Sequence, residues 1–331
     1  MSSGDDITVR LVAPEEASLL IGLIRRCYGE TYIDPSFYSE TVVGERLASR
    51  WLHSIGAFRN AGQLVGHMGI TVRMHGGITA DAGMTLVDPA FRGRGIASRV
   101  AVGLAEQSMA LGLVGVHDYP VTVHAATQRI GAGFGVDTGL MLANMPGDVV
   151  FQQMETPAPG SRTSSLIRWL PFGRAPERSV YLPQRYRAKI EALYAEASLS
   201  RTVLQPDAHL GEWRSELEQA YDERRQILRL VVTSAGGDLG ARVEAEICAA
   251  ADRGGLVAHA DLSLAHAATP AVADALRAHG FSFAGLLPEY RDGDVLRMQW
   301  LAGSVDRAAS SVISTDSTRE IVAFVSADRG A

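Results

Sequence analysis

The 331-residue sequence contains only two cysteines, Cys27 and Cys248, one in each half of the chain. Neither stands in a spacing that binds a metal or closes a local disulfide. No group of His, Cys, Asp and Glu residues shows the spacing typical of metal ligands either. We therefore expect two buried thiols in a reducing compartment and no bound metal.

Long apolar runs and an excess of positive charge are also absent. No apolar stretch approaches the ~18 residues that cross a bilayer, and residues 1–6 lack the pattern of a signal peptide. The net charge of −6 argues against nucleic acid as the main partner. We therefore expect a cytoplasmic protein that binds neither membrane nor nucleic acid. A content of 47% apolar and 21% charged residues is typical of a globular protein, and the length suits two domains.

Residues 87–97, Val-Asp-Pro-Ala-Phe-Arg-Gly-Arg-Gly-Ile-Ala, carry the clearest functional signal. They follow an extended apolar run and open a helix predicted over 95–111. The first amides of such a helix have no partner within it, and together with the helix dipole and two arginines they favour a pyrophosphate. The stretch has neither the G-x-x-x-x-G-K-[ST] pattern nor a full G-x-G-x-x-G followed by an acidic residue about 20 positions later.

The pattern Arg-x-x-Gly-x-Ala, formed by Arg92, Gly95 and Ala97 after a strand that ends in Val-Asp-Pro, resembles the acyl-coenzyme A loop of the GNAT superfamily of N-acyltransferases. The resemblance implies acetyl-CoA, or another acyl-CoA, as the cofactor. The residues expected to bind it are Leu86, Val87, Arg92, Gly93, Arg94, Gly95, Ile96 and Ala97.

The order of predicted elements over about residues 7–150 is similar to that of the same family: strand, two helices, three antiparallel strands, helix, strand, helix, strand. The implied fold class is α/β (α+β), with two GNAT-like domains, each a mixed, mostly antiparallel sheet flanked by helices. We expect residues 1–155 to form the GNAT domain with the acyl-CoA loop and residues 179–302 to form a degenerate GNAT-like domain. Residues 156–178 are the expected connecting segment, in which 165–170 could form a last strand of the first sheet. Residues 303–331 are the expected tail, in which 316–327 could form a short helix.

The second half repeats the later elements of the first. Helices are predicted over 183–197, around 210–223, up to about 253 and over 269–279, and strands over 226–233, 256–264, 281–287 and 295–301. The half lacks the Arg-x-x-Gly-x-Ala loop, and Asp238 would repel a pyrophosphate where that loop should be. We therefore expect a structural or substrate-covering role for it.

Amide formation from a thioester requires a neutral amine, a polarised carbonyl and a proton for the leaving thiolate. Counting back from the loop, Asp81 matches the position of the family's usual carboxylate base; a surface or salt-bridged carboxylate is the alternative. The usual tyrosine acid and asparagine are replaced by Arg129 and Thr122. Candidates for the missing proton donor cluster at a strand end: His117, Asp118, Tyr119 and His124.

The loop over residues 28–38 is rich in tyrosines and acids. These side chains could line a pocket for a polar or cationic ligand, or could simply pin the loop to the core. The candidate substrate-binding residues are Tyr28, Tyr32, Asp34, Tyr38 and Asp118.

These observations predict an acyl-CoA-dependent N-acetyltransferase in which a small-molecule or peptide amine attacks the thioester directly. The alternative is a non-catalytic acyl-CoA-binding module with a regulatory protein partner, favoured by the missing tyrosine and the degenerate second half. Exposed sheet edges would allow a homodimer.

Overall fold

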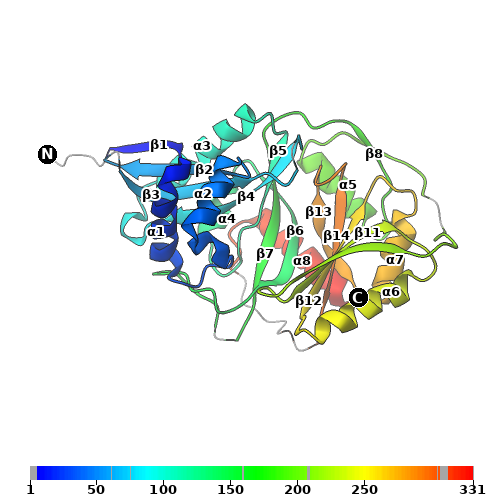
Figure 1. The fold of residues 1–331 in the computed structure, drawn as a ribbon. Coiled ribbons are helices and arrows are strands. Elements are labelled where there is room, and N and C mark those ends of the chain that lie inside the picture. The colour runs from blue at the N-terminus through cyan, green and yellow to red at the C-terminus, as the bar shows by residue number, and fades with distance from the viewer. Residues whose placement is uncertain are drawn as a thin grey trace.

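The computed structural model describes residues 6–60, 62–74, 76–158, 160–206, 209–303, 305 and 312–330. One twelve-stranded sheet runs through the molecule from end to end, and two short strands, β8 and β9, pair separately (Figure 1). The mixed α/β class is as predicted, but the two expected sheets are joined into one. Its order is β1 (Ile7–Leu11), β2 (Leu52–Arg59), β3 (Gln63–Thr71), β4 (Thr79–Val87), β5 (Gly115–Asp118), β7 (Thr163–Pro171), β6 (Val136–Met145), β13 (Ser282–Leu287), β14 (Val295–Leu301), β12 (Val257–Ser263), β11 (Ile227–Ser234) and β10 (Glu216–Asp222).

Helices cover both faces of the first half of the sheet. The helices α1 (Ala17–Tyr28) and α2 (Glu40–Ala48) pack on one face, where Leu20 and Ile24 are fully buried. The helix α3 (Ile96–Ala110) packs on the other face, because Ile96, Val100 and Leu104 form an apolar stripe against β2 and β3. All three helices were predicted from the sequence, and the burial of this stripe fixes the start of α3.

The strands β4 and β5 are parallel but separate after three residue pairs, Thr79–Asp81 with 115–117. The sequence predicts a strand over residues 113–123 that is interrupted at Pro120. The strand β5 ends at Asp118, and residues 119–125 form a loop with one isolated bridge, from Val121 to Ser165. Pro120 accounts for this end, because it has no N–H to donate to a neighbouring strand. The divergence leaves β4 unpaired on that side from Ala82 to Val87.

The two halves meet where β6 pairs with β13. Gly139 lies directly opposite Gly285, and each glycine leaves no room for a side chain on the other. The Gln299 side chain of β14 accepts a hydrogen bond from the Leu142 N–H at 2.8 Å and donates to the Leu140 carbonyl at 3.1 Å. The strand predicted within the connecting segment is β7, which lies between β5 and β6, so the first half of the sheet extends to Pro171.

The second half of the sheet repeats a topology found in the first. The strand β11 is parallel to β12, β12 is antiparallel to β14, and β14 is antiparallel to β13. The strands β4, β5, β7 and β6 have the same order and directions. The other elements of this half are the strands β8 (Arg178–Val180) and β9 (Arg201–Val203) and the helices α5 (Arg187–Glu196), α6 (Leu239–Ala251), α7 (Thr269–Ala278) and α8 (Asp316–Gly330). The short helix α4 (Ala126–Gly131) belongs to the first half.

The tail helix predicted over 316–327 is present as α8. It packs against β6 and β13, and its Ile321 and Val325 side chains are buried in a core shared by both halves. Because one face of α8 touches a strand from each half, the helix covers the junction between them (Figure 1).

Two sequence predictions for the second half are wrong. The helix predicted around 210–223 is the edge strand β10, in which Leu217 and Tyr221 pack against the core. Residues four apart lie on one face of a strand as well as of a helix, so this spacing does not distinguish the two. Cys248, expected to be buried, is exposed on α6, whereas Cys27 is buried as predicted.

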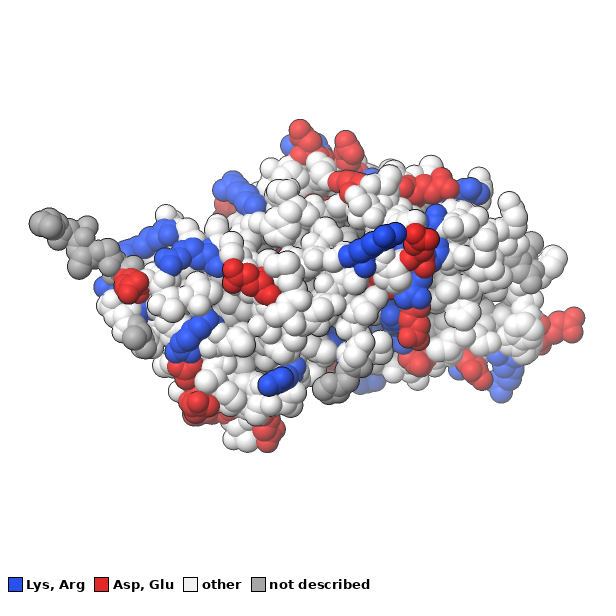
Figure 2. Space-filling view, turned by 90° about the horizontal axis from the view of Figure 1, so that it is seen from above, with Lys and Arg blue, Asp and Glu red and all other residues white. Residues whose placement is uncertain are grey.

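On the face seen in Figure 2, cationic and anionic side chains are interspersed, and their described members form no extended area of one sign. Of the helices in the described ranges, none has the length and apolar character needed to cross a bilayer.

Candidate active site

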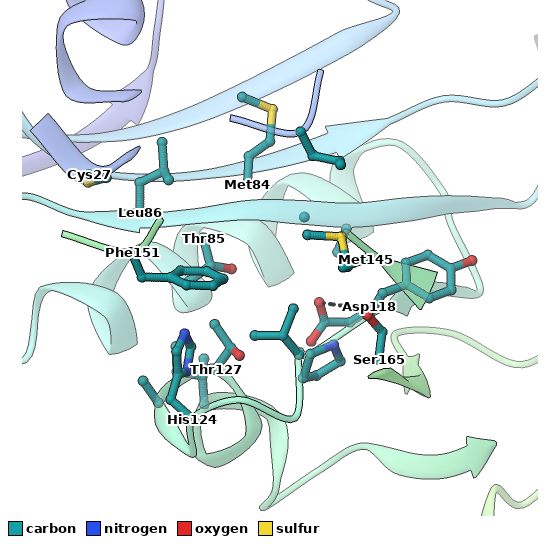
Figure 3. A pocket seen from close by; sticks show the side chains of 18 of the residues that line it. Cys27, Met84, Thr85, Leu86, Asp118, His124, Thr127, Met145, Phe151 and Ser165 are labelled. Atoms are coloured by element: carbon teal, nitrogen blue, oxygen red, sulfur yellow. Dashed lines mark hydrogen bonds between the residues drawn. The ribbon is translucent and has the colours of Figure 1, made fainter. Parts of the chain in front are cut away.

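A cavity of about 740 Å³ lies where β4 and β5 diverge. Its wall runs from the loop before α3, along the unpaired part of β4, to strands of the second half. The side chains of Phe151, His124, Thr127 and Asp118 lie on one side of the strand that carries Leu86 (Figure 3). Most of the residues predicted to bind cofactor or substrate, or to act in catalysis, line this cavity: Tyr28, Tyr32, Asp81, Leu86, Val87, Arg92, Gly93, Gly95, Ile96, Ala97, Asp118, Tyr119 and His124.

The loop at the start of α3 has the conformation that an anion site requires. Gly93 and Gly95 have φ values of 76° and 72°, and a Cβ added at either position would have no atom within 4 Å outside its immediate neighbours. Gly95 caps the helix, so the first amides of α3 point past it without intrahelical acceptors. The glycines thus keep both the backbone turn and the approach to the amides open.

The two arginines of the loop differ in position. The Arg92 guanidinium lines the cavity and is held by the carbonyls of Val87 at 3.3 Å and Gln152 at 2.6 Å. Arg94 does not line the cavity; its guanidinium lies over the Phe91 ring and donates to the Ala90 carbonyl. Arg92 therefore stands closest to where the sequence places the pyrophosphate.

A bulge in β4 shapes the cavity wall. Met84 has a φ of 53°, and the pairing with β3 shifts register beside it. The buried His67 ring contacts the Met84 carbonyl through Nδ1 at 2.9 Å and the Ser54 hydroxyl through Nε2 at 2.6 Å. Burial lowers the pKa of His67 to about 4, so the ring is neutral, donates from Nδ1 and accepts at Nε2. His67 therefore holds the bulge in place.

Two carboxylates face the cavity in different environments. Asp81 forms an ion pair with Arg73 and accepts a hydrogen bond from the Tyr119 hydroxyl at 2.9 Å. Asp118 accepts only from the Tyr119 N–H, at 3.0 Å, among the hydrogen bonds of the described residues. Burial raises the pKa of both carboxyls, that of Asp118 to about 6.

The two histidines predicted at the strand end lie in different places. His117 is fully buried between the rings of Trp169 and Tyr290 and does not line the cavity. His124 lines it, with its ring edge-on to Phe151 at 5.0 Å, and its Nδ1 has no hydrogen-bond partner among the described residues. Burial lowers the pKa of both histidines, so both are neutral near pH 7.

The loop over residues 28–38 combines both roles that the sequence left open. The Tyr38 hydroxyl donates to the Gly29 carbonyl at 2.8 Å and accepts from the Tyr32 N–H at 3.0 Å. Asp34 caps the turn over Pro35–Tyr38 and pairs with Arg46. Tyr38 and Asp34 therefore hold the loop, and neither lines the cavity, whereas Tyr28 and Tyr32 do.

The second half contributes cavity residues that the sequence analysis did not identify. They were detectable in part, because Arg229 interrupts the apolar run of β11 and His259 stands between two alanines of β12. What the sequence could not show is that these strands approach the first half. The residues are Arg225, Arg229, His259, Tyr290 and Arg297.

Comparison with known proteins gives a family match within the first half. Residues 19–125 match the family model described as the acetyltransferase (GNAT) family. No match was found among curated proteins. Within the described ranges, no three His, Cys, Asp or Glu side chains are grouped to hold a metal ion.

Solved structures that resemble the chain cover about half of it. The ribosomal-protein-S18-alanine N-acetyltransferase of Escherichia coli shares 13% identity at a TM-score of 0.41, over 52% of this chain and 97% of its own. An N-acetyltransferase from Staphylococcus aureus shares 15% sequence identity at a TM-score of 0.40, and the match covers 50% of this chain and 99% of its own. The PaiA N-acetyltransferase of Thermoplasma acidophilum, solved with coenzyme A, shares 14% sequence identity at a TM-score of 0.35, and the match covers 50% of this chain and 99% of its own.

Proposed function

We propose that the chain, which carries a GNAT acetyltransferase domain at residues 19–125, transfers an acetyl group from acetyl-CoA to a primary amine by direct attack. The observation that carries this proposal is a continuous cavity joining the loop at Gly93 and Gly95 to the carboxylates Asp81 and Asp118. Acetyl-CoA would supply the thioester carbonyl, which the amine attacks as the carbon–sulfur bond breaks.

The residues present fit the cofactor. Glycines with positive φ expose the amides at the start of α3, and Arg92 adds a positive charge beside them. The unpaired part of β4 offers backbone groups to an extended amide-containing arm, as an added strand would use them. These groups would bind and orient acyl-CoA.

We assign the proton acceptor to Asp118. Its pKa of about 6 leaves it ionised at neutral pH, and no described cation pairs with it. Asp81, the base predicted from the sequence, is engaged by Arg73 and Tyr119 and therefore orients Tyr119. Burial raises the pKa of Tyr119, so its hydroxyl stays protonated and is our candidate donor to the leaving thiolate.

We also propose that residues 179–302 are a divergent GNAT-like copy without a cofactor site. The repeated strand order supports this origin. The Asp238 carboxylate occupies the turn before α6, where it accepts hydrogen bonds from the Ser215 N–H and hydroxyl at 2.8 and 2.7 Å. An anion there would meet a negative charge.

One observation favours a second candidate function, a non-catalytic acyl-CoA-binding module. Arg129, at the position where the resemblance places a tyrosine acid, is exposed on α4 and does not line the cavity. Binding of acetyl-CoA without acetyl transfer to any amine in a broad panel would favour this candidate.

Calorimetric titration with acetyl-CoA, CoA and longer acyl-CoAs tests the proposal. We expect one site per chain, and we expect Gly95→Asp to weaken binding at least about a hundredfold, because its carboxylate would repel the pyrophosphate. Gly112→Asp is the matched control, since Gly112 follows the other end of α3 with a φ of 69° and similarly open surroundings. Wild-type protein without acetyl-CoA binding, or unchanged binding in Gly95→Asp, would contradict the proposal.

A further inference from the structure

One face of the second-half sheet carries polar side chains where the other is apolar. Arg229 of β11 lies beside His259 of β12, which lies beside Gln299 of β14. Arg297 precedes Gln299 by two residues and therefore points to the same face. The neighbours that alternate with them, such as Leu228, Ala258 and Met298, are buried in the apolar core.

This polar face lines the cavity. Arg229, His259 and Arg297 all belong to the cavity wall, and Arg225 joins them from the turn before β11. The second half thus presents three guanidinium groups to a cavity whose other end carries the cofactor loop.

The positive charges on this face are incompletely balanced. Arg297 is neutralised by Asp261, which it contacts with two nitrogens at 2.6 and 2.7 Å. Arg225 and Arg229 instead share one oxygen, Asp222 Oδ2, at 2.9 and 3.2 Å. Two cations and one carboxylate leave about one unit of positive charge in this corner.

His259 supplies a second, independent sign of a ligand. Its side chain is only 3% exposed and lines the cavity, yet its Nε2 has no hydrogen-bond partner among the described residues. A buried polar atom without a partner is costly unless a ligand or water satisfies it. Burial and the nearby Arg297 and Arg229 lower the pKa of His259, so the ring is neutral and can donate one hydrogen bond.

The first half contributes the opposite charge. Asp118 lies in the cavity wall and has no ion-pair partner among the described residues. The cavity therefore offers a carboxylate from the first half and a surplus of guanidinium from the second. A ligand that complements both ends carries a cation and an anion.

Resting on the proposed function, we infer that the acceptor is an amine that also bears an anionic group, a carboxylate or a phosphate, which Arg225, Arg229 and His259 bind while the amine faces Asp118. Guanidinium groups match both anions through paired N–H donors. An amino acid and an aminoalkyl phosphate both meet this description.

Matched amines test the inference on protein saturated with CoA. Calorimetry would compare 4-aminobutyrate with putrescine and 4-aminobutanamide, and 2-aminoethyl phosphate with ethanolamine; a series from glycine to 6-aminohexanoate would set the spacing. We expect the carboxylate or the phosphate member to bind about ten- to a hundredfold more tightly than its partners without the anion. The anion, carboxylate or phosphate, that gives the larger gain in affinity over its matched amine is the one that the site prefers. Equal or tighter binding of the partners lacking it would overturn the inference.

Variants locate the anion site. Arg229→Gln should remove most of this preference and leave the Kd for CoA unchanged, whereas Arg224→Gln should keep both, because Arg224 pairs with Asp148 and does not line the cavity. Thermal melting would show that both variants fold. An unchanged preference in Arg229→Gln would overturn the inference.

Acetyl transfer, measured as free thiol release with the same amines, separates the two proposals. If amines without an anionic group are acetylated preferentially, the inferred substrate class is wrong, and the proposed acetyltransferase activity is supported. Anion binding that depends on Arg229, without transfer to any amine, would support the anion site and overturn the transferase.

Discussion

Asp81 and Asp118 show how neighbouring groups give two carboxylates different roles. Both are held in the cavity wall at the end where β4 and β5 still pair. Arg73 and Tyr119 already use an oxygen of Asp81, whereas Asp118 accepts one backbone hydrogen bond and has no ion-pair partner among the described residues, because its neighbour Arg168 is paired with Asp137. A base must give up its existing partners to accept a proton, so Asp118 is better placed.

At this scale we predict that Asp118→Asn lowers kcat by about 10²–10⁴-fold, the usual contribution of a general base. In the enzyme without substrate the Asp118 carboxyl has a pKa of about 6, so wild-type kcat/KM should rise with pH through about 6 and level off above it. The asparagine variant should lack this rise. Initial rates of thiol release from pH 5 to 8 provide the measurement.

The variant Asp81→Asn serves as the comparison. Because Asp81 orients Tyr119, its loss should lower kcat less and leave the acidic limb near pH 6 in place. If the limb disappears in Asp81→Asn and persists in Asp118→Asn, the two assignments are reversed. Acetyl-CoA titration of both variants should give the wild-type Kd.

At the scale of an element, the bulge of β4 depends on a neutral histidine. The ring of His67 bridges the Met84 carbonyl and the Ser54 hydroxyl, and it is fully enclosed. A proton on Nε2 would place a charge in the core and remove the acceptor that Ser54 uses. The bulge is therefore stable only while the histidine stays unprotonated.

The pH dependence of stability follows from this. His67 has a pKa of 6.5 when unfolded and about 4 when folded, so the unfolded state binds more protons between these values. Its contribution is complete above pH 6.5 and decreases as the pH falls towards 4, by about 3 kcal/mol in total. Denaturant unfolding at pH 7 and pH 4 measures this loss. In His67→Gln, which cannot titrate, the loss should be smaller by that amount; parallel pH curves would contradict the prediction.

At the scale of the whole molecule, the two halves act as one body because their sheets are continuous. The strand pair β6 and β13 joins them, α8 covers the junction, and the apolar core extends across it. The cavity depends on this arrangement, since its wall includes residues of both halves.

A substitution at the junction tests this dependence. A Cβ at Gly139 would collide with the backbone of Ala284 and Gly285. We predict that Gly139→Ala costs about 3 kcal/mol and lowers the Tm by roughly 4–5 °C. The acceptor KM should rise while the acetyl-CoA Kd stays close to wild type, because the cofactor loop lies in the first half alone. Calorimetric melting and titration would measure both.

The control for this prediction is Gly133→Ala, where no atom outside the immediate neighbours lies within 4 Å of a Cβ. It should change the Tm by no more than a degree or two. An equal decrease in Tm in both variants would mean that the junction has no special role. A weaker acetyl-CoA affinity in Gly139→Ala would mean that the cofactor site also depends on the second half.

The sequence by itself determined the local features of this protein. The sequence predicted α1, α3, α6 and α7, α3 from its apolar stripe, and the glycines and arginines at residues 92–95 indicated the loop at the start of α3. Such features depend on neighbours a few residues apart, whose spacing is written in the chain. The prediction of an edge strand as a helix around 210–223 shows the limit of that spacing, because packing across the sheet decided between the two.

Only the tertiary structure decided how distant segments combine. It joined the two expected sheets through Gly139 and Gly285, engaged Asp81 in an ion pair while leaving Asp118 without one among the described residues, and brought residues of the second half such as Arg229 and His259 into the cavity wall. The physical reason is that burial, charge compensation and shape depend on residues that are far apart in the chain. The sequence names these residues, but the distances between them arise only when the strands pair.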